Sequence, residues 1–181
     1  MNAKIIKTLI PECYEIQPEM LYDERGQFVK IFNKDFYVQN NMEYKYSEEY
    51  YSISHKGVLR GLHFQIPPYE HIKLVYCVEG FVFDAVVDLR KNSPTYGKYD
   101  TFKLDAEKAN MLYIPSGLAH GFYVLSERAI MVYKVTTVYS SEHDTGILWN
   151  SADIPWPDKS PILSERDGQF IEFDQFRSPF K

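Results

Sequence analysis

Four side chains that can carry positive charge lie within fourteen positions of an apolar, strand-like segment, VLRGLHFQIPPYEHIKLVYC (residues 58–77). They are Arg60, His63, His71 and Lys73. Histidine titrates near neutral pH, so an imidazole here is suited to take a proton from a substrate. A lysine or arginine beside it can stabilise the negative charge that such a step creates. The same residue types also build metal sites, so the segment has two chemical interpretations.

The metal interpretation requires more ligands than the chain offers in the expected places. In cupin barrels an HxH pair on one strand and a PxGxxH motif on a later strand converge on one ion. The second motif is present as Pro115, Gly117 and His120. The first is broken, because Gln65 stands two residues after His63 and an amide oxygen is a poor ligand for zinc or iron. We therefore expect no metal.

Most of the chain has the pattern of short strands. The 15 Tyr and 12 Phe residues favour strands, because their rings pack well on pleated surfaces. In FVFDAVVDL (residues 81–89) odd and even positions form two distinct faces. The turn at 78–80 predicts a hairpin between this strand and KLVYC. Short helices are predicted at Asn33–Asn41, with Asn33 as N-cap, and around LSERD. The tail after Trp149 is expected to wrap a β-sandwich or barrel.

Length and charge limit the class of protein. The 181 residues predict a single domain spanning residues 1–181. The net charge is −5 without a basic block, so neither nucleic acid nor an anionic membrane is an expected partner. Cys13 and Cys77 are far apart and predict two reduced thiols in a cytoplasmic protein. The start, MNAKIIKTLIPEC, predicts neither a signal peptide nor a membrane span.

Several motifs, in order and spacing, resemble the nucleotide-sugar 3,5-epimerase family. They are KGVLRGLHFQ, KLVYCVEGFVFDAVVDLRKNSPTYGK, IPSGLAHGFYVLSE, YKVTTVYSSEHDTGILWN and DIPWP, and the match runs from about Tyr22 to Asp167. The resemblance implies an all-β cupin jelly-roll barrel with a few short peripheral helices. It also implies a homodimer that acts on a nucleoside-diphosphate-4-keto sugar without metal or cofactor.

The resemblance implies a role for each matching residue. His63 in RGLHFQ resembles the catalytic base, and Asp167 in SERD resembles the carboxylate that orients it. Tyr133 in VYKVT resembles the acid on the other side of the sugar, and Lys73 in IKLV resembles the group that stabilises the enolate. The implied ligand contacts are Arg25, Arg60 (diphosphate), His120 (sugar), Tyr139 (stacking near the nucleobase) and Glu142 (binding rim).

The chemistry of a 4-keto sugar agrees with these residue types. The carbons beside the carbonyl have acidified protons, and inversion needs a base on one face and an acid on the other. Alternation puts Tyr133 and Tyr139 on one strand face. It puts Arg60 and His63 on opposite faces, so both can meet one ligand only if the strand is irregular, which we expect at Gly61.

Some positions depart from the family pattern on the ligand-binding side. Lys30 stands where Glu is usual, and Glu48 and Tyr50 stand where Gln and Asn are usual. His71 replaces Gln, and Tyr76 replaces Arg. Because exchanged donors and acceptors leave a wrong ligand unpaired, these changes suggest an altered base or sugar preference. A GDP- or CDP-linked 4-keto-6-deoxyhexose or heptose, as in a surface polysaccharide, therefore competes with the dTDP sugar.

Other functions remain open from the sequence. The enzyme could invert C3 alone or both C3 and C5, because the same base and acid serve either carbon. A sugar 3,4-ketoisomerase on a similar barrel would be expected to carry paired histidines where this chain has HFQ. A non-catalytic nucleotide-sugar binder and a metal-dependent cupin oxygenase are the alternatives from other classes.

Overall fold

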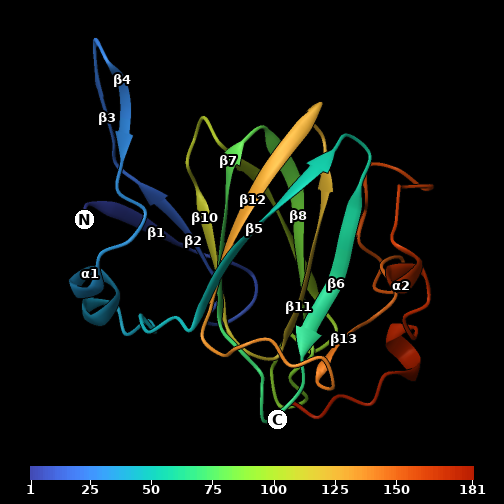
Figure 1. Cartoon of the computed structure of the whole chain (residues 1–181). Helices are drawn as coiled ribbons and strands as arrows, with labels where there is room; N and C mark the ends of the chain where they lie inside the picture. The colour runs from blue at the N-terminus through green and yellow to red at the C-terminus, as the bar shows by residue number, and fades with distance from the viewer.

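Two antiparallel sheets face each other in the computed structural model, which describes all 181 residues (Figure 1). The six-stranded sheet has the order β1 (Ala3–Lys7), β2 (Tyr14–Pro18), β10 (Met111–Ile114), β7 (Lys73–Glu79), β12 (Arg128–Val135) and β5 (Glu48–His55). The five-stranded sheet has the order β13 (Asp144–Gly146), β6 (Leu59–Gln65), β11 (Leu118–Val124), β8 (Phe81–Asp88) and β9 (Tyr99–Asp105). The predicted all-β fold is confirmed.

Strand β8 shows how alternation builds two cores at once. Its even-numbered residues Val82 and Val86 lie in the core between the sheets, where they pack with Phe122 and Met131. Its odd-numbered residues, such as Val87, belong to a second core on the outer face of the five-stranded sheet. The strand is therefore apolar on both faces, which explains why it reads as a nearly continuous hydrophobic run.

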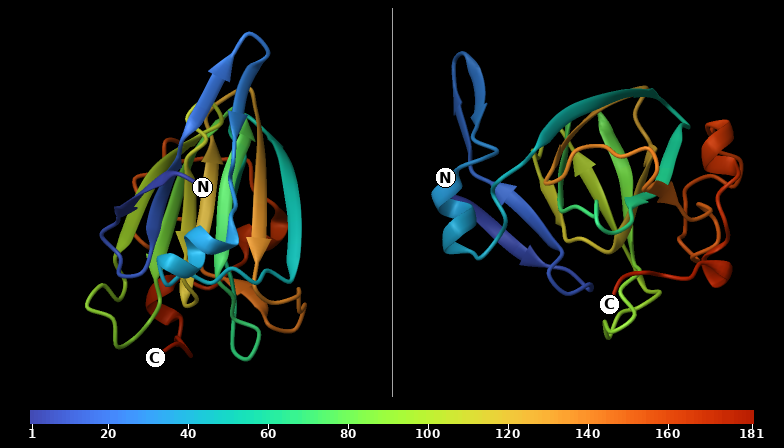
Figure 2. Two further views of the ribbon diagram at one scale, coloured as in Figure 1. Left: turned by 90° about the vertical axis from the view of Figure 1, so that its left-hand side faces the viewer. Right: turned by 60° about the horizontal axis from the view of Figure 1, so that its bottom comes forward.

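Chain segments at both ends cover the outer faces of the sheets (Figure 2). On the six-stranded sheet, α1 (Lys34–Gln39) contributes the buried Tyr37 to a third core. On the five-stranded sheet, the tail after Trp149 carries α2 (Glu165–Gly168) and η1 (Phe173–Gln175), which confirms that the tail wraps the barrel. No helix in the chain combines the length and apolar character needed to cross a membrane.

Both predicted helices are present, and the first begins at its predicted cap, Asn33. The Asn33 side-chain oxygen accepts a hydrogen bond from the Phe36 backbone N–H at 3.1 Å. The Ser164 hydroxyl accepts one from the Asp167 backbone N–H at 3.1 Å. These bonds satisfy amide groups that have no partner within the first helical turn. The second cap also fixes the position of Asp167, one of the proposed catalytic residues.

The prediction of a hairpin between KLVYC and the following strand is wrong. Strand β7 belongs to the six-stranded sheet, whereas β8 pairs with β9 and β11 in the other sheet. The chain turns the corner between the sheets at Gly80, whose φ is +73°. A Cβ atom there would lie 2.1 Å from the Arg128 carbonyl oxygen, so only glycine fits. Alternation identified both strands but carried no information about their partners.

The predicted irregularity at Gly61 is confirmed. The pairing of β6 with β11 shifts register between His120 and Phe122, opposite this glycine. Gly61 has a φ of +140°, and a Cβ atom would lie 2.5 Å from the Gly121 Cα. Because the register shifts here, Arg60 and His63 both line the same cavity despite their odd spacing.

The hairpin of β3 (Met20–Asp23) and β4 (Gly26–Val29) projects from the body of the protein as an arm (Figures 1 and 2). The arm exposes three large apolar side chains, those of Leu21, Tyr22 and Phe28. Such a row of exposed apolar groups on a two-stranded element is typical of a surface that packs against another surface.

Candidate active site

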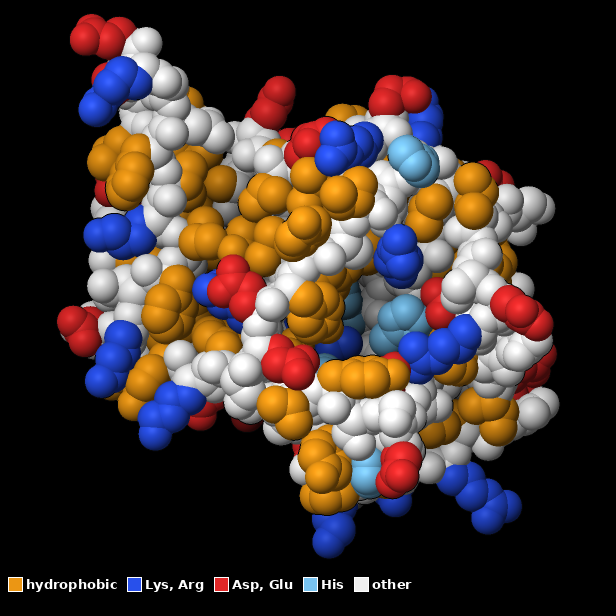
Figure 3. All heavy atoms as spheres, viewed as in Figure 1, with side chains coloured by type: hydrophobic (Ala, Val, Ile, Leu, Met, Phe, Trp, Pro, Cys, Tyr) orange, Lys and Arg blue, Asp and Glu red, His pale blue; other side chains and the backbone are white.

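A cavity of about 420 Å³ opens between the two sheets, and histidine and basic side chains are visible inside it (Figure 3). Strands β5, β6, β7, β11 and β12 supply most of its lining. The lining residues are Glu48, Tyr50, Ser52, Arg60, His63, Gln65, His71, Lys73, His120, Phe122, Tyr133, Val135, Thr137, Tyr139 and Asp144.

His63 and Asp167 form a hydrogen-bonded pair at the wall of the cavity. His63 Nε2 lies 2.7 Å from Asp167 Oδ1, and Asp167 Oδ2 accepts the Gly61 backbone N–H at 3.2 Å. Burial raises the pKa of Asp167, but its hydrogen bonds to His63, Gly61 and Ser164 outweigh burial and hold that pKa below its usual value. An ionised carboxylate only accepts, so the imidazole proton lies on Nε2 and Nδ1 keeps its lone pair. The pair therefore presents His63 as a base.

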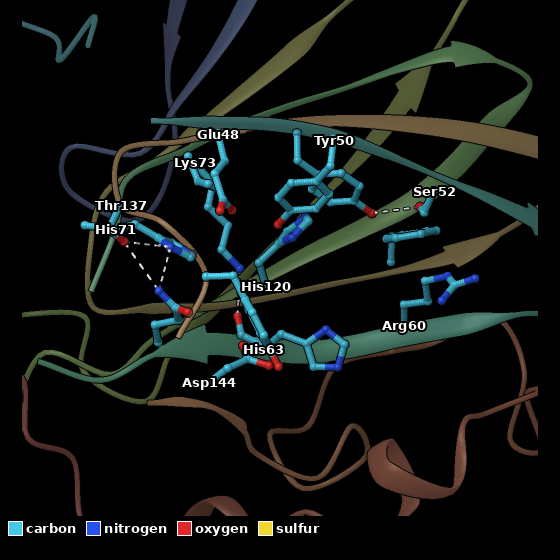
Figure 4. A pocket seen from close by; sticks show the side chains of 15 residues that line it. Glu48, Tyr50, Ser52, Arg60, His63, His71, Lys73, His120, Thr137 and Asp144 are labelled. Atoms are coloured by element: carbon cyan, nitrogen blue, oxygen red, sulfur yellow. Dashed lines mark hydrogen bonds between the residues drawn. The ribbon is translucent and has the colours of Figure 1, made fainter. Parts of the chain in front are cut away.

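Tyr133 reaches the cavity from β12, on the sheet opposite to His63. Its hydroxyl group lies 3.2 Å from the Ser52 hydroxyl, and its ring stacks on Tyr50 with centroids 4.9 Å apart (Figure 4). Burial raises the pKa of Tyr133 well above that of a free phenol. The phenol is therefore protonated at neutral pH and can act as an acid.

Lys73 brings a positive charge into the same cavity. Its side chain is 7% exposed, and Nζ donates a hydrogen bond to the His63 carbonyl oxygen at 3.1 Å. Burial lowers the pKa of Lys73 to about 8, while Asp144 and Asp84 favour the charged form. Strand β7 lies between β10 and β12, so Lys73 does not protect a sheet edge. A buried ammonium ion near a reacting carbonyl would stabilise a developing oxyanion.

His120 of the PxGxxH motif forms a second histidine–carboxylate pair, with Asp84. Nε2 of His120 lies 2.8 Å from Asp84 Oδ2, and both side chains are buried. Burial raises the pKa of Asp84, and its Oδ1 has no hydrogen-bond partner. No group of three or more His, Cys, Asp and Glu side chains is arranged to hold a metal ion.

The structure brings most of the predicted site residues together. The cavity lining includes His63, Lys73, Tyr133, Arg60, His120, Tyr139 and Glu48, and Asp167 stands behind His63. Three predicted contacts lie elsewhere. Arg25 is at the turn of the arm, where it pairs with Asp23. Lys30 follows β4, and Glu142 is in the exposed loop before β13.

Several cavity residues were not named from the sequence, Ser52 and Asp144 among them. On β5, Ser52 lies two positions after Tyr50 and four positions after Glu48. Alternation along that strand therefore indicated that Ser52 faces the cavity as they do. Asp144 enters the cavity because β13 pairs with β6, opposite Gln65. No local pattern in the sequence indicates that pairing.

An all-β barrel with an acid, a base and a cation around one cavity is the arrangement of a cupin-type sugar-nucleotide epimerase. The family model of dTDP-4-dehydrorhamnose 3,5-epimerase matches residues 7–175. The dTDP-4-dehydrorhamnose 3,5-epimerase of Shigella flexneri is 46% identical over 178 residues, covering 95% of this chain and 98% of the relative.

A solved structure agrees over almost the whole chain. It is the dTDP-6-deoxy-D-glucose-3,5-epimerase of Legionella pneumophila in complex with dTDP-4-keto-L-rhamnose, with 36% identity, a TM-score of 0.93 and coverage of 97% of this chain and 95% of that one. A dTDP-4-dehydrorhamnose 3-epimerase of Streptomyces niveus is 37% identical over 87% of this chain and 78% of the relative. The chain belongs to the dTDP-4-dehydrorhamnose 3,5-epimerase family and is an isomerase.

Proposed function

We propose that the chain inverts C3 and C5 of a nucleoside-diphosphate-4-keto-6-deoxyhexose, in the synthesis of a surface-polysaccharide sugar. One observation carries the proposal. His63, with a free Nδ1 lone pair, and Tyr133, with a retained proton, reach one cavity from opposite sheets. Inversion of a carbon centre needs a base and an acid on opposite faces of the sugar ring.

The proposed steps follow from the charges in the cavity. His63 Nδ1 takes the proton from C3, and the C–H electron pair moves into the enolate, which places negative charge on the C4 oxygen. The Lys73 ammonium group stabilises that charge, which is present only once the reaction has begun. Tyr133 then donates its proton to the other face of C3. Rotation of the sugar presents C5 to the same residues, and the two side chains regain their protonation states through exchange with water.

For the nucleotide, the relatives favour dTDP. The Shigella flexneri and Legionella pneumophila proteins are both named for dTDP sugars. The departures at Lys30, Glu48 and Tyr50 are the grounds for testing GDP- and CDP-linked hexoses and heptoses as competitors. Calorimetric titration with dTDP, GDP and CDP tests the assignment. We expect dTDP to bind most tightly, and a clear preference for GDP or CDP would reassign the substrate.

We further propose that the protein is a homodimer in which the arm reaches the partner's cavity. The exposed Leu21, Tyr22 and Phe28 side chains support this, because a partner surface would cover them. Arg25 at the arm's turn would then contact the ligand from the second copy, and Lys30 and Glu142 would lie near the same rim. Analytical ultracentrifugation should give a dimer for the native chain and a monomer for a Leu21→Ser, Phe28→Ser variant.

We expect the dimer to act in the cytoplasm, where the free Cys13 and Cys77 thiols stay reduced.

Solvent deuterium tests the reaction itself. In D₂O we expect two deuterium atoms per sugar, one at C3 and one at C5, counted by mass spectrometry. A single deuterium atom, at C3, would indicate inversion of C3 alone, the reaction for which the Streptomyces niveus relative is named. A carbonyl that moves to C3, seen by NMR, would identify a ketoisomerase instead. Tight binding without any deuterium incorporation would identify a non-catalytic binder.

A further inference from the structure

The ring of Tyr50 lies against the ring of the proposed acid, Tyr133. The two residues face each other across the β5–β12 pair, and their rings are nearly parallel, with an interplanar angle of 16° and centroids 4.9 Å apart. In Figure 4 the Tyr50 side chain points into the cavity from β5. Tyr50 is 45% exposed and belongs to an edge strand, so packing of the core does not require an aromatic ring at this position.

The polar contact of Tyr133 holds only the end of its side chain. Its hydroxyl group lies 3.2 Å from the Ser52 hydroxyl, and the His120 ring meets the Tyr133 ring edge-on with centroids 6.4 Å apart. The phenol oxygen lies on the axis of the ring, so it moves whenever that axis swings about the Cα–Cβ bond. A hydrogen bond at the tip permits such a swing, whereas a ring packed along the face of Tyr133 opposes it.

Resting on the function proposed above, we propose that Tyr50 is a positioning residue, which keeps the Tyr133 hydroxyl aligned with the sugar carbon and so favours inversion over return of the proton. The enolate can regain a proton from either of two groups. Return from His63 restores the original centre, and donation from Tyr133 inverts it. Because proton transfer slows steeply when the donor is misplaced, the alignment of Tyr133 sets the share of the enolate that is inverted.

The position of this ring is a departure from the family pattern. Tyr50 stands where Asn is usual, and an amide cannot cover a phenol ring over the same area. Tyr50 also has a hydroxyl group of its own and lines the cavity, so the ring and the hydroxyl must be tested separately.

The ratio of inverted product to deuterium exchanged without inversion tests the proposal, measured in D₂O at early conversion by NMR and mass spectrometry. Tyr50→Ala should lower this ratio on the order of 10-fold, because exchange by His63 continues while donation from Tyr133 slows. Tyr50→Phe keeps the stacked ring and should retain the native ratio. Tyr51→Ala is the matched control, since it removes an exposed ring from the other face of the same strand.

The ratio is insensitive to a general loss of structure, because a poorly folded variant loses exchange and inversion together. A native ratio in Tyr50→Ala would overturn the proposal. A fall in Tyr50→Phe as large as that in Tyr50→Ala would also overturn it, by assigning the effect to the Tyr50 hydroxyl. An equal fall in Tyr51→Ala would overturn it by assigning the effect to the strand as a whole. Failure of the proposed function is a different result, in which the native chain itself incorporates no deuterium.

A second measurement does not depend on catalysis. Crystal structures of the two Tyr50 variants should show the Tyr133 oxygen displaced from the Ser52 hydroxyl in Tyr50→Ala and at the native distance of 3.2 Å in Tyr50→Phe. A Tyr133 oxygen at its native position in Tyr50→Ala would overturn the proposal, whether or not the native chain is an epimerase.

Discussion

The cavity contains two histidine–carboxylate pairs of nearly equal length that differ in their surroundings. His63 Nε2 and Asp167 Oδ1 are 2.7 Å apart, and His120 Nε2 and Asp84 Oδ2 are 2.8 Å apart. The His63 side chain is 29% exposed and that of His120 is 4% exposed. Asp167 receives a backbone N–H, whereas one oxygen of Asp84 has no partner. The same two residue types thus form an accessible base in one place and a buried polar support in the other.

The difference between the carboxylates follows from hydrogen bonding. Both lose hydration on burial, which raises the pKa of a carboxyl group. Hydrogen bonds to His63, Gly61 and Ser164 stabilise the ionised form of Asp167 by more than burial destabilises it, so its pKa falls. Asp84 receives support from His120 and from the charge of Lys73, but burial outweighs them and its pKa rises. A catalytic pair needs the first situation, because only a stable carboxylate favours the imidazolium ion that forms when the base takes a proton.

The two pairs should differ most in how far kcat falls when the histidine of each pair is replaced. His63→Asn removes the base, and kcat should fall on the order of 10⁴-fold. His120→Asn keeps a hydrogen-bonding side chain at the buried pair, and kcat should fall on the order of 10-fold. Steady-state rates with the dTDP-4-keto sugar measure both. A comparable loss for the two variants would contradict the assignment of different roles.

Replacing the carboxylates should also lower kcat more in the His63–Asp167 pair than in the His120–Asp84 pair. The difference between the two variants should be smaller than it is for the histidines. Asp167→Asn can donate its amide proton to His63 Nε2, which places the imidazole proton on Nδ1 and removes the lone pair facing the substrate. We expect kcat to fall on the order of 10³-fold. Asp84→Asn should lower kcat by less than about 10-fold, because its partner does not react. Circular dichroism spectra like that of the native chain are the control, and equal effects on kcat would refute the comparison.

Lys73 lies near both pairs, and its charge should set the alkaline limit of activity. Its pKa is lowered to about 8 by burial, so the ammonium form predominates below that value and is lost above it. We expect kcat to fall by up to about 10-fold for each pH unit above pH 8. Lys73→Arg should move this limb to higher pH, because a guanidinium group stays charged. An unchanged alkaline limb in that variant would mean that another group titrates.

The smallest expected effects are on stability, where the two carboxylates should show opposite pH dependence. The pKa of Asp167 is lowered by folding, so its stabilisation is present above its unfolded pKa and is lost as the pH falls through its folded pKa. The pKa of Asp84 is raised, so its contribution is favourable at low pH and is lost as the pH rises through its folded pKa.

Thermal unfolding between about pH 3 and pH 7 measures this difference. The gap in Tm between the native chain and Asp167→Asn should widen as the pH rises, whereas the gap to Asp84→Asn should narrow. Slopes of the same sign for the two variants would show that the carboxylates have similar environments after all.

The sequence predicted those parts of the molecule that local patterns control. The cap at Asn33 marks the first helix, and alternation on β12 turns Tyr133 toward the cavity. Tyr139 also lines the cavity, but the prediction that it shares this strand is wrong, because β12 ends at Val135. The odd spacing of Arg60 and His63 requires the irregular strand seen at Gly61. Each of these features depends on residues within a few positions of one another.

The features that the sequence did not predict depend on long-range pairing. Alternation in β7 and β8 says which side chains share a face, but the sheet to which each strand belongs depends on distant partners. Asp144 reaches the cavity only through the pairing of β13 with β6. Arg25 lies at the turn of the arm that projects from the body, and family motifs alone could not place it relative to this chain's cavity.

The central claim is that His63 and Tyr133 act on opposite faces of one sugar carbon, and Tyr133→Phe in D₂O tests it most directly. Without the phenol, His63 should still remove the C3 proton and return deuterium to the same face, so mass spectrometry should find exchange while NMR finds no inverted sugar. His63→Asn should abolish both exchange and inversion. Inverted product from Tyr133→Phe at the native rate, or deuterium exchange in His63→Asn at the native rate, would contradict the account.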